Sequence, residues 1–262
     1  MPRKIRYIRD PASGLEAVFC LGSGIAYPLH SHVSVYTAGL VLSGTVQLTA
    51  GPAQRVLRQG EGFLLPPDLP HSIRPLGQYS LLSLCVPRAL ARPEAAAALR
   101  QGISRLLGGG PEALFAPENT LLGPQARAGL AALLARLPAA AGTLRKADPP
   151  VEALRRRLEQ CPEQKLSLDE MARAACLSKY HLIRVFRRQT GLTPHQFQLQ
   201  NRVRRAQRLL AAGPDALPAA EAALAAGFCD QSHLVRCFER LVGLSPRAYR
   251  AACVCLQSGP FK

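Results

Sequence analysis

The sequence predicts a multidomain α+β protein with a β-rich N-terminal half, a helical middle segment and an all-α C-terminal half. Three observations support this prediction. Short apolar runs between Gly and Pro turns fill residues 15–86, apolar residues recur at helical spacing from 93 to 137, and one helical pattern is written twice after residue 151. At 262 residues, the chain is long enough for two domains.

The N-terminal half contains short apolar runs that are separated by turn residues at regular intervals. The runs occupy residues 17–21, 40–42, 46–48, 62–65 and 81–86. This spacing is typical of an antiparallel sandwich or barrel. We therefore expect a β-barrel over about residues 10–90.

The middle segment, residues 91–137, contains two apolar stripes at helical spacing. One consists of Leu99, Ile103, Leu106 and Leu107, and the other of Leu130, Leu133, Leu134 and Leu137. Because the second stripe has no other evident partner in the sequence, we expect it to bridge domains or to form a homodimer. Replacing Leu130 and Leu134 with Lys should then give a monomer. Residues 138–150 follow as an expected linker that ends in a Pro pair.

The C-terminal part, residues 151–252, contains the same pattern twice at a constant offset. Residues 178–186 return as 230–238, so that Leu182 corresponds to Leu234 and Arg184 to Arg236. A Gly-Leu-Thr-Pro or Gly-Leu-Ser-Pro segment follows each copy, and an Ala-rich helical stretch precedes it. A short helix, a turn and a second helix with a polar face form a helix-turn-helix unit. In such a unit the second helix enters the DNA major groove.

The two second helices place polar and cationic residues opposite their apolar face. In the first unit these residues are Ser178, Lys179, Tyr180, Ile183, Arg184 and Arg187, and in the second they are Gln231, Ser232, Val235 and Arg236. Arg184 could bind a guanine edge, while Lys179 and Arg187 could reach phosphates. Gln231 suits an adenine edge, and Val235 suits a thymine methyl group.

Charge and cysteine content limit the possible partners and compartments. The formal net charge of +16 attracts polyanions, but charge alone does not separate DNA from RNA or an anionic membrane. The eight cysteines include no Cys-x-x-Cys pair, no secretory leader is evident, and no uncharged apolar run approaches about 18 residues. We therefore expect a cytoplasmic protein with reduced thiols and no membrane partner.

Residues 151–251 resemble the DNA-binding domain of the AraC/XylS transcription regulators. In the first unit the resemblance rests on Ala172, Ser178, Leu182, Arg184, Phe186, Gly191 and Pro194, and in the connecting helix on Arg202, Ala206, Leu209 and Leu210. In the second unit it rests on Ala223, Gly227, Phe228, Asp230, Ser232, Arg236, Phe238, Gly243, Ser245, Pro246, Tyr249 and Arg250. The resemblance implies a bacterial transcription regulator that binds double-stranded promoter DNA, forms a homodimer, contacts RNA polymerase and is not an enzyme.

The N-terminal half resembles the cupin barrel, which many AraC-type regulators carry as a sensor. Gly24-x5-His30-x-His32 is similar to the first cupin motif, and Gly60-x5-Pro66-x-Asp68-x2-His71 to the second, with Asp68 in place of a Gly. In metal-binding cupins the resemblance implies ligands at the three His and at a Glu between them. Here the Glu position is Thr37, with Tyr36 beside it.

Three interpretations of the histidines remain open. His30, His32 and His71 could hold Zn²⁺, Ni²⁺ or Fe²⁺ with one open position. They could instead, together with Tyr36, bind a small organic effector in the barrel mouth, which we favour because the Glu ligand is missing. Finally, they could be paired with backbone and have no further role. Cys20 and Cys85 could lie near this pocket, although a small buried residue is the simpler interpretation for each.

The sequence therefore predicts a DNA-binding transcription regulator that is controlled by an effector in its N-terminal barrel. Its two helix-turn-helix units should occupy successive major-groove segments roughly 34 Å apart. One alternative is a cupin metalloenzyme, of oxygenase or isomerase type, with a regulatory DNA-binding tail, but no carboxylate accompanies the three His. Another is a DNA-repair methyl acceptor, for which the first half offers only Cys20 and Cys85.

Overall fold

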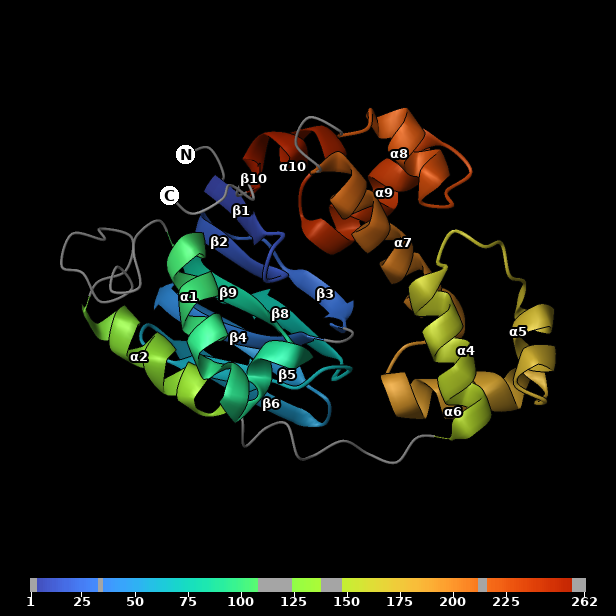
Figure 1. Ribbon diagram of the computed structural model, residues 1–262, viewed down its shortest axis with the longest axis horizontal. Coiled ribbons are helices and arrows are strands. Elements are labelled where there is room, and N and C mark those ends of the chain that lie inside the picture. The colour runs from blue at the N-terminus through green and yellow to red at the C-terminus, as the bar shows by residue number, and fades with distance from the viewer. Residues whose placement is uncertain (1–3, 33–34, 108–123, 138–147, 212–215, 256–262) are drawn as a thin grey trace.

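The computed structural model describes residues 4–32, 35–107, 124–137, 148–211 and 216–255. Its strands gather in one half of the molecule and the helices α4 to α10 in the other (Figure 1). The expected order of a β-rich half, a helical middle segment and a helical C-terminal half is thereby confirmed. Within the described residues, no helix combines the length and apolarity that crossing a membrane requires.

The N-terminal half consists of two sheets. The larger has the order β10-β1-β2-β9-β4-β7, formed by Cys253–Cys255, Lys4–Asp10, Leu15–Ser23, Tyr79–Pro87, Val35–Ser43 and Gly62–Leu65. The smaller has the order β3-β8-β5-β6, formed by Tyr27–His30, His71–Pro75, Thr45–Ala50 and Ala53–Arg58. The described strands thus form the cupin-like N-terminal half that the sequence predicts, arranged as two sheets.

The larger sheet is buried on both faces, which explains the continuous apolar run in β9. Leu82 and Leu84 belong to one hydrophobic cluster, while Leu81 belongs to another cluster on the opposite side of the strand. A strand covered on both faces has no need for alternating polar residues. The cluster that contains Leu82 and Leu84, here called the outer cluster, lies under α1 (Ala96–Leu106) and α2 (Pro124–Ala135), which cover the sheet in Figure 1. Two short 3₁₀ turns, Arg88–Ala91 and Pro93–Ala95, precede α1.

The second leucine stripe packs against its own chain. Leu130 is fully buried and Leu133 is 7% exposed, and both belong to the cluster between the helices and the larger sheet. The close fit is visible at Gly62, where an added Cβ would overlap the Leu133 side chain. The expectation that Leu130 and Leu134 lack a partner within the chain, and so form a dimer seam, is therefore wrong. Whether the segment forms a dimer through other residues stays a prediction.

The C-terminal half contains seven described helices. They are α4 (Pro149–Gln160), α5 (Leu168–Ala174), α6 (Lys179–Thr190), α7 (Pro194–Leu210), α8 (Ala219–Ala225), α9 (Gln231–Val242) and α10 (Pro246–Ala252). α4 begins with the Pro pair of the expected linker, since a Pro in the first helical turn sacrifices no hydrogen bond. Residues 138–147 of that linker lie outside the described residues.

The duplicated sequence pattern corresponds to two equivalent helix pairs. α6 and α9 both have 12 residues, and each begins after a side chain that accepts a hydrogen bond from the backbone: Ser178 in one case and Asp230 in the other. Each ends at a glycine in the left-handed region, Gly191 with φ 72° and Gly243 with φ 80°. The sequence prediction of two helix-turn-helix units, α5–α6 and α8–α9, is therefore confirmed.

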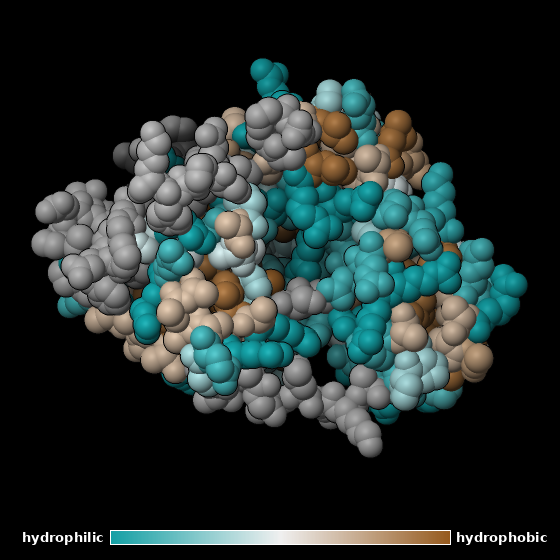
Figure 2. Space-filling view, viewed as in Figure 1, coloured by the Kyte–Doolittle hydropathy of each residue, from teal (hydrophilic) through white to brown (hydrophobic). Residues whose placement is uncertain are grey.

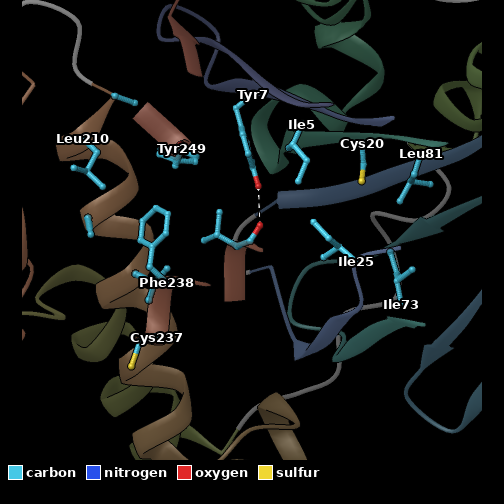
Figure 3. Packing of buried hydrophobic residues seen from close by; sticks show 14 of the residues in the cluster. Ile5, Tyr7, Cys20, Ile25, Ile73, Leu81, Leu210, Cys237, Phe238 and Tyr249 are labelled. Atoms are coloured by element: carbon cyan, nitrogen blue, oxygen red, sulfur yellow. Dashed lines mark hydrogen bonds between the residues drawn. The ribbon is translucent and has the colours of Figure 1, made fainter. Parts of the chain in front are cut away.

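The two halves share a hydrophobic cluster. Tyr7 and Ile25 from the sheets lie in it together with Phe238, Val242 and Tyr249 from the helices. Figure 3 shows the Tyr7 hydroxyl pointing across this interface, where it donates a hydrogen bond to the Val242 carbonyl at 3.1 Å. The strand β10 also returns from α10 to pair in parallel with β1. The halves are thus packed against each other, in addition to the covalent connection through the expected linker.

Candidate functional site

The three histidines come together as the two motifs predict. His30 ends β3 and pairs in register with His71 at the start of β8, while His32 lies just beyond β3. Their ring centroids are 4.3 to 5.2 Å apart, and one ligand atom from each lies within 4.8 Å of the others. His71 therefore approaches from the neighbouring strand of the same sheet.

Backbone hydrogen bonds set the tautomers of two of these imidazoles. His30 Nδ1 lies 2.7 Å from the Pro28 carbonyl oxygen, and His71 Nδ1 lies 2.9 Å from that of Leu69. Because a carbonyl only accepts, Nδ1 carries the proton and Nε2 keeps its lone pair. Burial, together with the positive charge of Arg204, lowers the pKa of His30 to about 3 and that of His71 to about 4. The cluster is therefore neutral and rich in acceptors at physiological pH.

The histidines form part of the wall of a cavity of about 920 Å³ between the sheets and the C-terminal helices. The sheets contribute Tyr7, Arg9, Thr37, Phe63 and Cys85, among others, and the helices contribute Glu159, Gln200, Arg204, Arg208 and Val242, among others. In Figure 2 the surface is hollowed near the centre of the view, and the residues around the hollow are mostly hydrophilic. A cavity of this size suits a small organic ligand.

The structure corrects the prediction for Tyr36. Successive side chains of a strand point to opposite faces, and on β4 the Tyr36 ring enters the outer cluster under α1 and α2. Thr37, the next residue, lines the cavity instead, so Tyr36 is wrong as an effector contact. The Thr37 and Tyr27 hydroxyls are buried at this wall with no hydrogen-bond partner within the described residues.

Cys20 and Cys85 line the same cavity, and both are buried, as the simpler interpretation expects. The Cys85 sulfur lies 3.9 Å from His32 Nδ1. Burial raises the pKa of the Cys85 thiol to about 12, so this thiol stays protonated and is a poor nucleophile.

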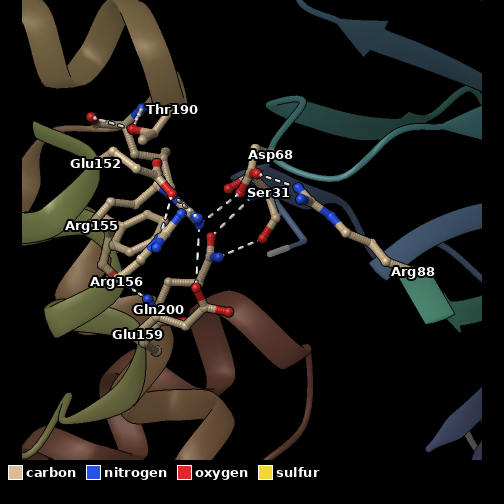
Figure 4. Close-up of polar contacts among 12 residues, drawn as sticks. Ser31, Asp68, Arg88, Glu152, Arg155, Arg156, Glu159, Thr190 and Gln200 are labelled. Carbon is tan, nitrogen blue, oxygen red and sulfur yellow. Dashed lines mark hydrogen bonds and ion pairs between the residues drawn. The ribbon is translucent and has the colours of Figure 1, made fainter. Parts of the chain in front are cut away.

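A polar link joins the histidine loop to α7. Ser31 lies between His30 and His32 and forms two backbone hydrogen bonds with the Gln200 side chain (Figure 4). Its N–H donates to Gln200 Oε1, and its carbonyl oxygen accepts from Gln200 Nε2. The Ser31 carbonyl also accepts a hydrogen bond from the Arg204 guanidinium. These hydrogen bonds attach the histidine loop directly to α7, which connects the two helix-turn-helix units.

A second polar link involves Asp68. Its carboxylate pairs with Arg88 at 2.9 Å within the N-terminal half and with Arg155 of α4 at 3.6 Å (Figure 4). Burial raises the pKa of Asp68, and the two guanidinium groups oppose this effect. The N-terminal half thus contacts the helical half through both cupin-type motifs.

The predicted contact face of α6 is accessible to solvent. Tyr180 is 87% exposed, and Lys179, Arg184 and Arg187 are also exposed, whereas Ile183 is half-buried. Lys179 pairs with Asp169 at 2.7 Å, an exposed ion pair that costs little to open. The capping residue Ser178 lines a shallow groove with Tyr180, His181 and Arg184, so His181 is a candidate contact that the sequence analysis misses.

The corresponding face of α9 has the same design. Gln231, Ser232 and Arg236 are exposed and Val235 is half-buried, while Leu234 and Phe238 are fully buried below them. Both helices therefore present a guanidinium at the equivalent position, Arg184 in α6 and Arg236 in α9.

The arginines of α7 divide their roles in a way that the sequence does not predict. Arg202 donates to the Pro162 and Gln164 carbonyls, and Arg205 donates to the Ala225 carbonyl, so both hold the helical half together. Arg204 and Arg208 line the cavity. Only the fold reveals that this face of α7 meets the histidine loop, although the four arginines are evident in the sequence.

Comparison with known families gives matches to both halves. A family model described as "AraC-like ligand binding domain" matches residues 21–158, more than half of the chain. A second, described as "Helix-turn-helix domain", matches residues 171–252. The first match contains the three histidines and the second contains α6 and α9.

Among known proteins, the HTH-type transcriptional regulator MtrA of Neisseria gonorrhoeae is 37% identical over 89 residues, which cover 34% of this chain and 29% of MtrA. The probable transcriptional regulator LumQ of Photobacterium leiognathi is 34% identical over 93 residues, which cover 36% of this chain and 37% of LumQ. The matches thus span about a third of these relatives. A structure of ToxT from Vibrio cholerae covers 93% of this chain and 99% of its own with a TM-score of 0.58 at 10% identity, a likeness of fold alone.

Proposed function

Because the chain belongs to the AraC family of transcription regulators, we propose that it binds promoter DNA through α6 and α9 under the control of an effector in the interdomain cavity. The observation that carries this proposal is the pair of equivalent helices with exposed cationic and hydrogen-bonding faces. A guanidinium at the same place in each helix suits two guanine edges. The polar link from Ser31 to α7 supports the control by an effector.

The proposal extends to the partners that this function needs. The protein would act in the cytoplasm on double-stranded DNA, as a homodimer, and would contact RNA polymerase. We expect it to act as a regulator and not as an enzyme, because the relatives that it matches are named transcriptional regulators.

Selection of bound duplexes from a random-sequence pool would test DNA binding. The expected result is a motif with two half-sites roughly one helical turn apart, and an affinity that falls steeply with salt because phosphate contacts release counterions. A pool that shows no enrichment, or binding without sequence preference, would contradict the proposal.

Control by an effector is tested with the triple variant His30→Ala, His32→Ala, His71→Ala. We expect it to keep basal DNA binding and to lose the response of a promoter fusion to the inducing growth condition. The matched control is His195→Ala, which removes an exposed imidazole from α7. A triple variant that responds normally would exclude the histidine wall as the effector site.

A second candidate function is metal sensing. The proximity of three histidine ligand atoms, all within 4.8 Å, supports a site for Zn²⁺, Ni²⁺ or Fe²⁺, and the backbone hydrogen bonds at Nδ1 leave Nε2 free to coordinate. Thr37 in place of a carboxylate ligand and the nearby Arg204 charge both disfavour a divalent cation. Elemental analysis showing near-stoichiometric metal that the triple variant loses would favour this function over an organic effector.

A further inference from the structure

The carboxylates that line the cavity are already neutralised. Asp10 pairs with Arg105 at 2.6 Å, Glu16 with Arg9 at 2.8 Å, and Glu159 with Arg155 at 3.2 Å. Each of these three acids lines the cavity and each has its own guanidinium. They are therefore poor partners for any additional cation at the wall.

Arg204 is a partly buried charge of the cavity wall without a carboxylate partner among the described residues. Within the described residues no carboxylate lies within ion-pair distance of Arg204, and its guanidinium donates to the uncharged Ser31 carbonyl. Arg208, one turn further along α7, also lines the cavity, but it is exposed to solvent, unlike Arg204. A guanidinium removed from water without a counter-ion is unfavourable, so this wall favours an anion.

The histidines, in contrast to Arg204, require a hydrogen-bond donor from the ligand. The Nδ1 atoms of His30 and His71 are occupied as donors, and no donor among the described residues reaches either Nε2. The two imidazoles lie side by side, with ring centroids 4.3 Å apart. A ligand therefore satisfies them with a hydroxyl or another hydrogen-bond donor.

Much of the remaining lining is apolar. Tyr7, Val18, Phe63, Ile73 and Leu81 line the same cavity. A carbon skeleton that bears an anionic group and a hydroxyl would be complementary to all three surfaces.

We infer that the effector is a hydroxylated organic anion, whose carboxylate or phosphate pairs with Arg204 of α7 and whose hydroxyl donates to the imidazoles of His30 and His71. This inference rests on the proposed effector role of the cavity. It goes beyond that role because it states the charge and the donor group of the ligand and assigns one recognition residue to the DNA-binding half. The ligand joins the sheet to the helix that connects both helix-turn-helix units.

Thermal unfolding of the wild-type protein without DNA tests the ligand class. The probes are 4-hydroxybenzoate, 4-hydroxyphenylacetate and 3-(4-hydroxyphenyl)propionate, which vary the distance between the hydroxyl and the carboxylate, together with 4-hydroxyphenyl phosphate. Each carboxylate is compared with its methyl ester, which lacks the charge, and its 4-methoxy analogue, which lacks the donor. We expect at least one hydroxylated anion to raise the midpoint temperature by a few degrees, and its two analogues to have little effect.

Variants of Arg204 test the assigned residue. Arg204→Gln should abolish the shift, Arg204→Lys should keep part of it, and the control Arg240→Ala, which removes an exposed guanidinium from α9, should keep all of it. If Arg204→Gln does not fold, the comparison of anion with ester in the wild-type protein still decides the charge requirement.

The inference is overturned if none of the four anions stabilises the protein, if the ester or methoxy analogue stabilises equally, or if Arg204→Gln keeps the full shift. A shift that disappears after treatment with EDTA would also overturn it, because the histidines would then hold a metal. Since no DNA is present, failure here is distinct from failure of DNA binding. Comparing the phosphate with the carboxylates identifies which anionic group the site prefers.

Discussion

Asp68 illustrates how one residue can serve both the local backbone and the interface. It occupies a position where the cupin motif usually has glycine, and its φ of 66° lies in the left-handed region. Asp tolerates this region better than most residues because its short polar side chain can bond locally. Its carboxylate then reaches Arg88 and Arg155, contacts that a glycine could not make. The departure from the motif thus gives a link between the two halves.

At the same scale, the histidines make stability depend on pH. The folded-state pKa values of His30 and His71 lie near 3 and 4, below the ordinary value of 6.5, because burial disfavours the charged form. Their contribution is complete above about pH 6.5 and is lost as the pH falls, since only the unfolded chain then binds protons. We expect the free energy of unfolding to decrease below pH 6.5 with a slope that approaches about 1.4 kcal/mol per pH unit for each such histidine near pH 5.

Urea unfolding at pH 7.5, 6.5 and 5.5 measures this effect. His71→Asn should make the dependence shallower by about one histidine's contribution, whereas the exposed His195→Asn should leave it unchanged. Equal slopes for the wild-type protein and His71→Asn would contradict the neutral, buried cluster.

The outward arginines of the recognition helices give the second prediction for single residues. Arg184→Ala and Arg236→Ala should each weaken specific DNA binding by about 1–3 kcal/mol without unfolding the protein, because both are exposed. Lys179→Ala should weaken binding to all sequences alike, since a phosphate contact carries no sequence information. Fluorescence anisotropy with specific and scrambled duplexes would measure both effects. Arg92→Ala, exposed on the N-terminal half, is the control, and wild-type affinity in both helix variants would refute the assignment.

At the scale of elements, the repeat and the motif spacing correctly predict the helices and the histidine cluster, whereas the sequence does not predict which face a side chain occupies. The repeated pattern predicts the caps, lengths and terminal glycines of α6 and α9 because these depend on local backbone chemistry. The spacing of the two His motifs also predicts the cluster. Tyr36 fails because a one-residue difference along β4 reverses the face, and the Leu130 stripe fails because its partner, the larger sheet, is distant in sequence.

The glycine at the end of α6 provides a prediction for an element. Gly191 has a positive φ, and an added Cβ would overlap the ring of Pro70 in the N-terminal half. Gly60 also has a positive φ but has open space around its Cα, so Gly60→Ala measures backbone strain alone, about 1–2 kcal/mol. We expect Gly191→Ala to destabilise the protein by clearly more.

Denaturant unfolding compares the two variants. The double variant Gly191→Ala, Pro70→Gly removes the obstructing ring and should recover the excess while it retains the strain. If Gly191→Ala and Gly60→Ala cost the same, then α6 does not rest on the N-terminal half.

At the scale of the whole molecule, the shared cluster makes the two halves dependent on each other. Sequence patterns could separate a β-rich part from a helical part, but they could not show that Tyr7 packs on Tyr249 with ring centroids 4.7 Å apart. Contacts between residues so far apart in sequence depend on the final topology. The cavity and Arg204 were unpredictable for the same reason, since they exist only where the halves meet.

This dependence predicts a single cooperative unfolding transition. Tyr7→Ala removes a buried aromatic ring from the interface and should separate the calorimetric trace into two transitions, because each half then unfolds with less influence from the other. Tyr36→Ala removes a comparable ring from the outer cluster and should lower the midpoint while one transition remains. Two transitions in the wild-type protein would contradict the coupling.

The pairing of β10 with β1 has a mechanical consequence. The helical half is attached to the sheets twice, once by the covalent chain that leads from α2 to α4 and once by the ladder between Tyr7–Arg9 and Cys253–Cys255. Because of these two attachments, the helical half cannot rotate about a single hinge. A large rotation of the helical half relative to the sheets would therefore first require this short ladder to separate.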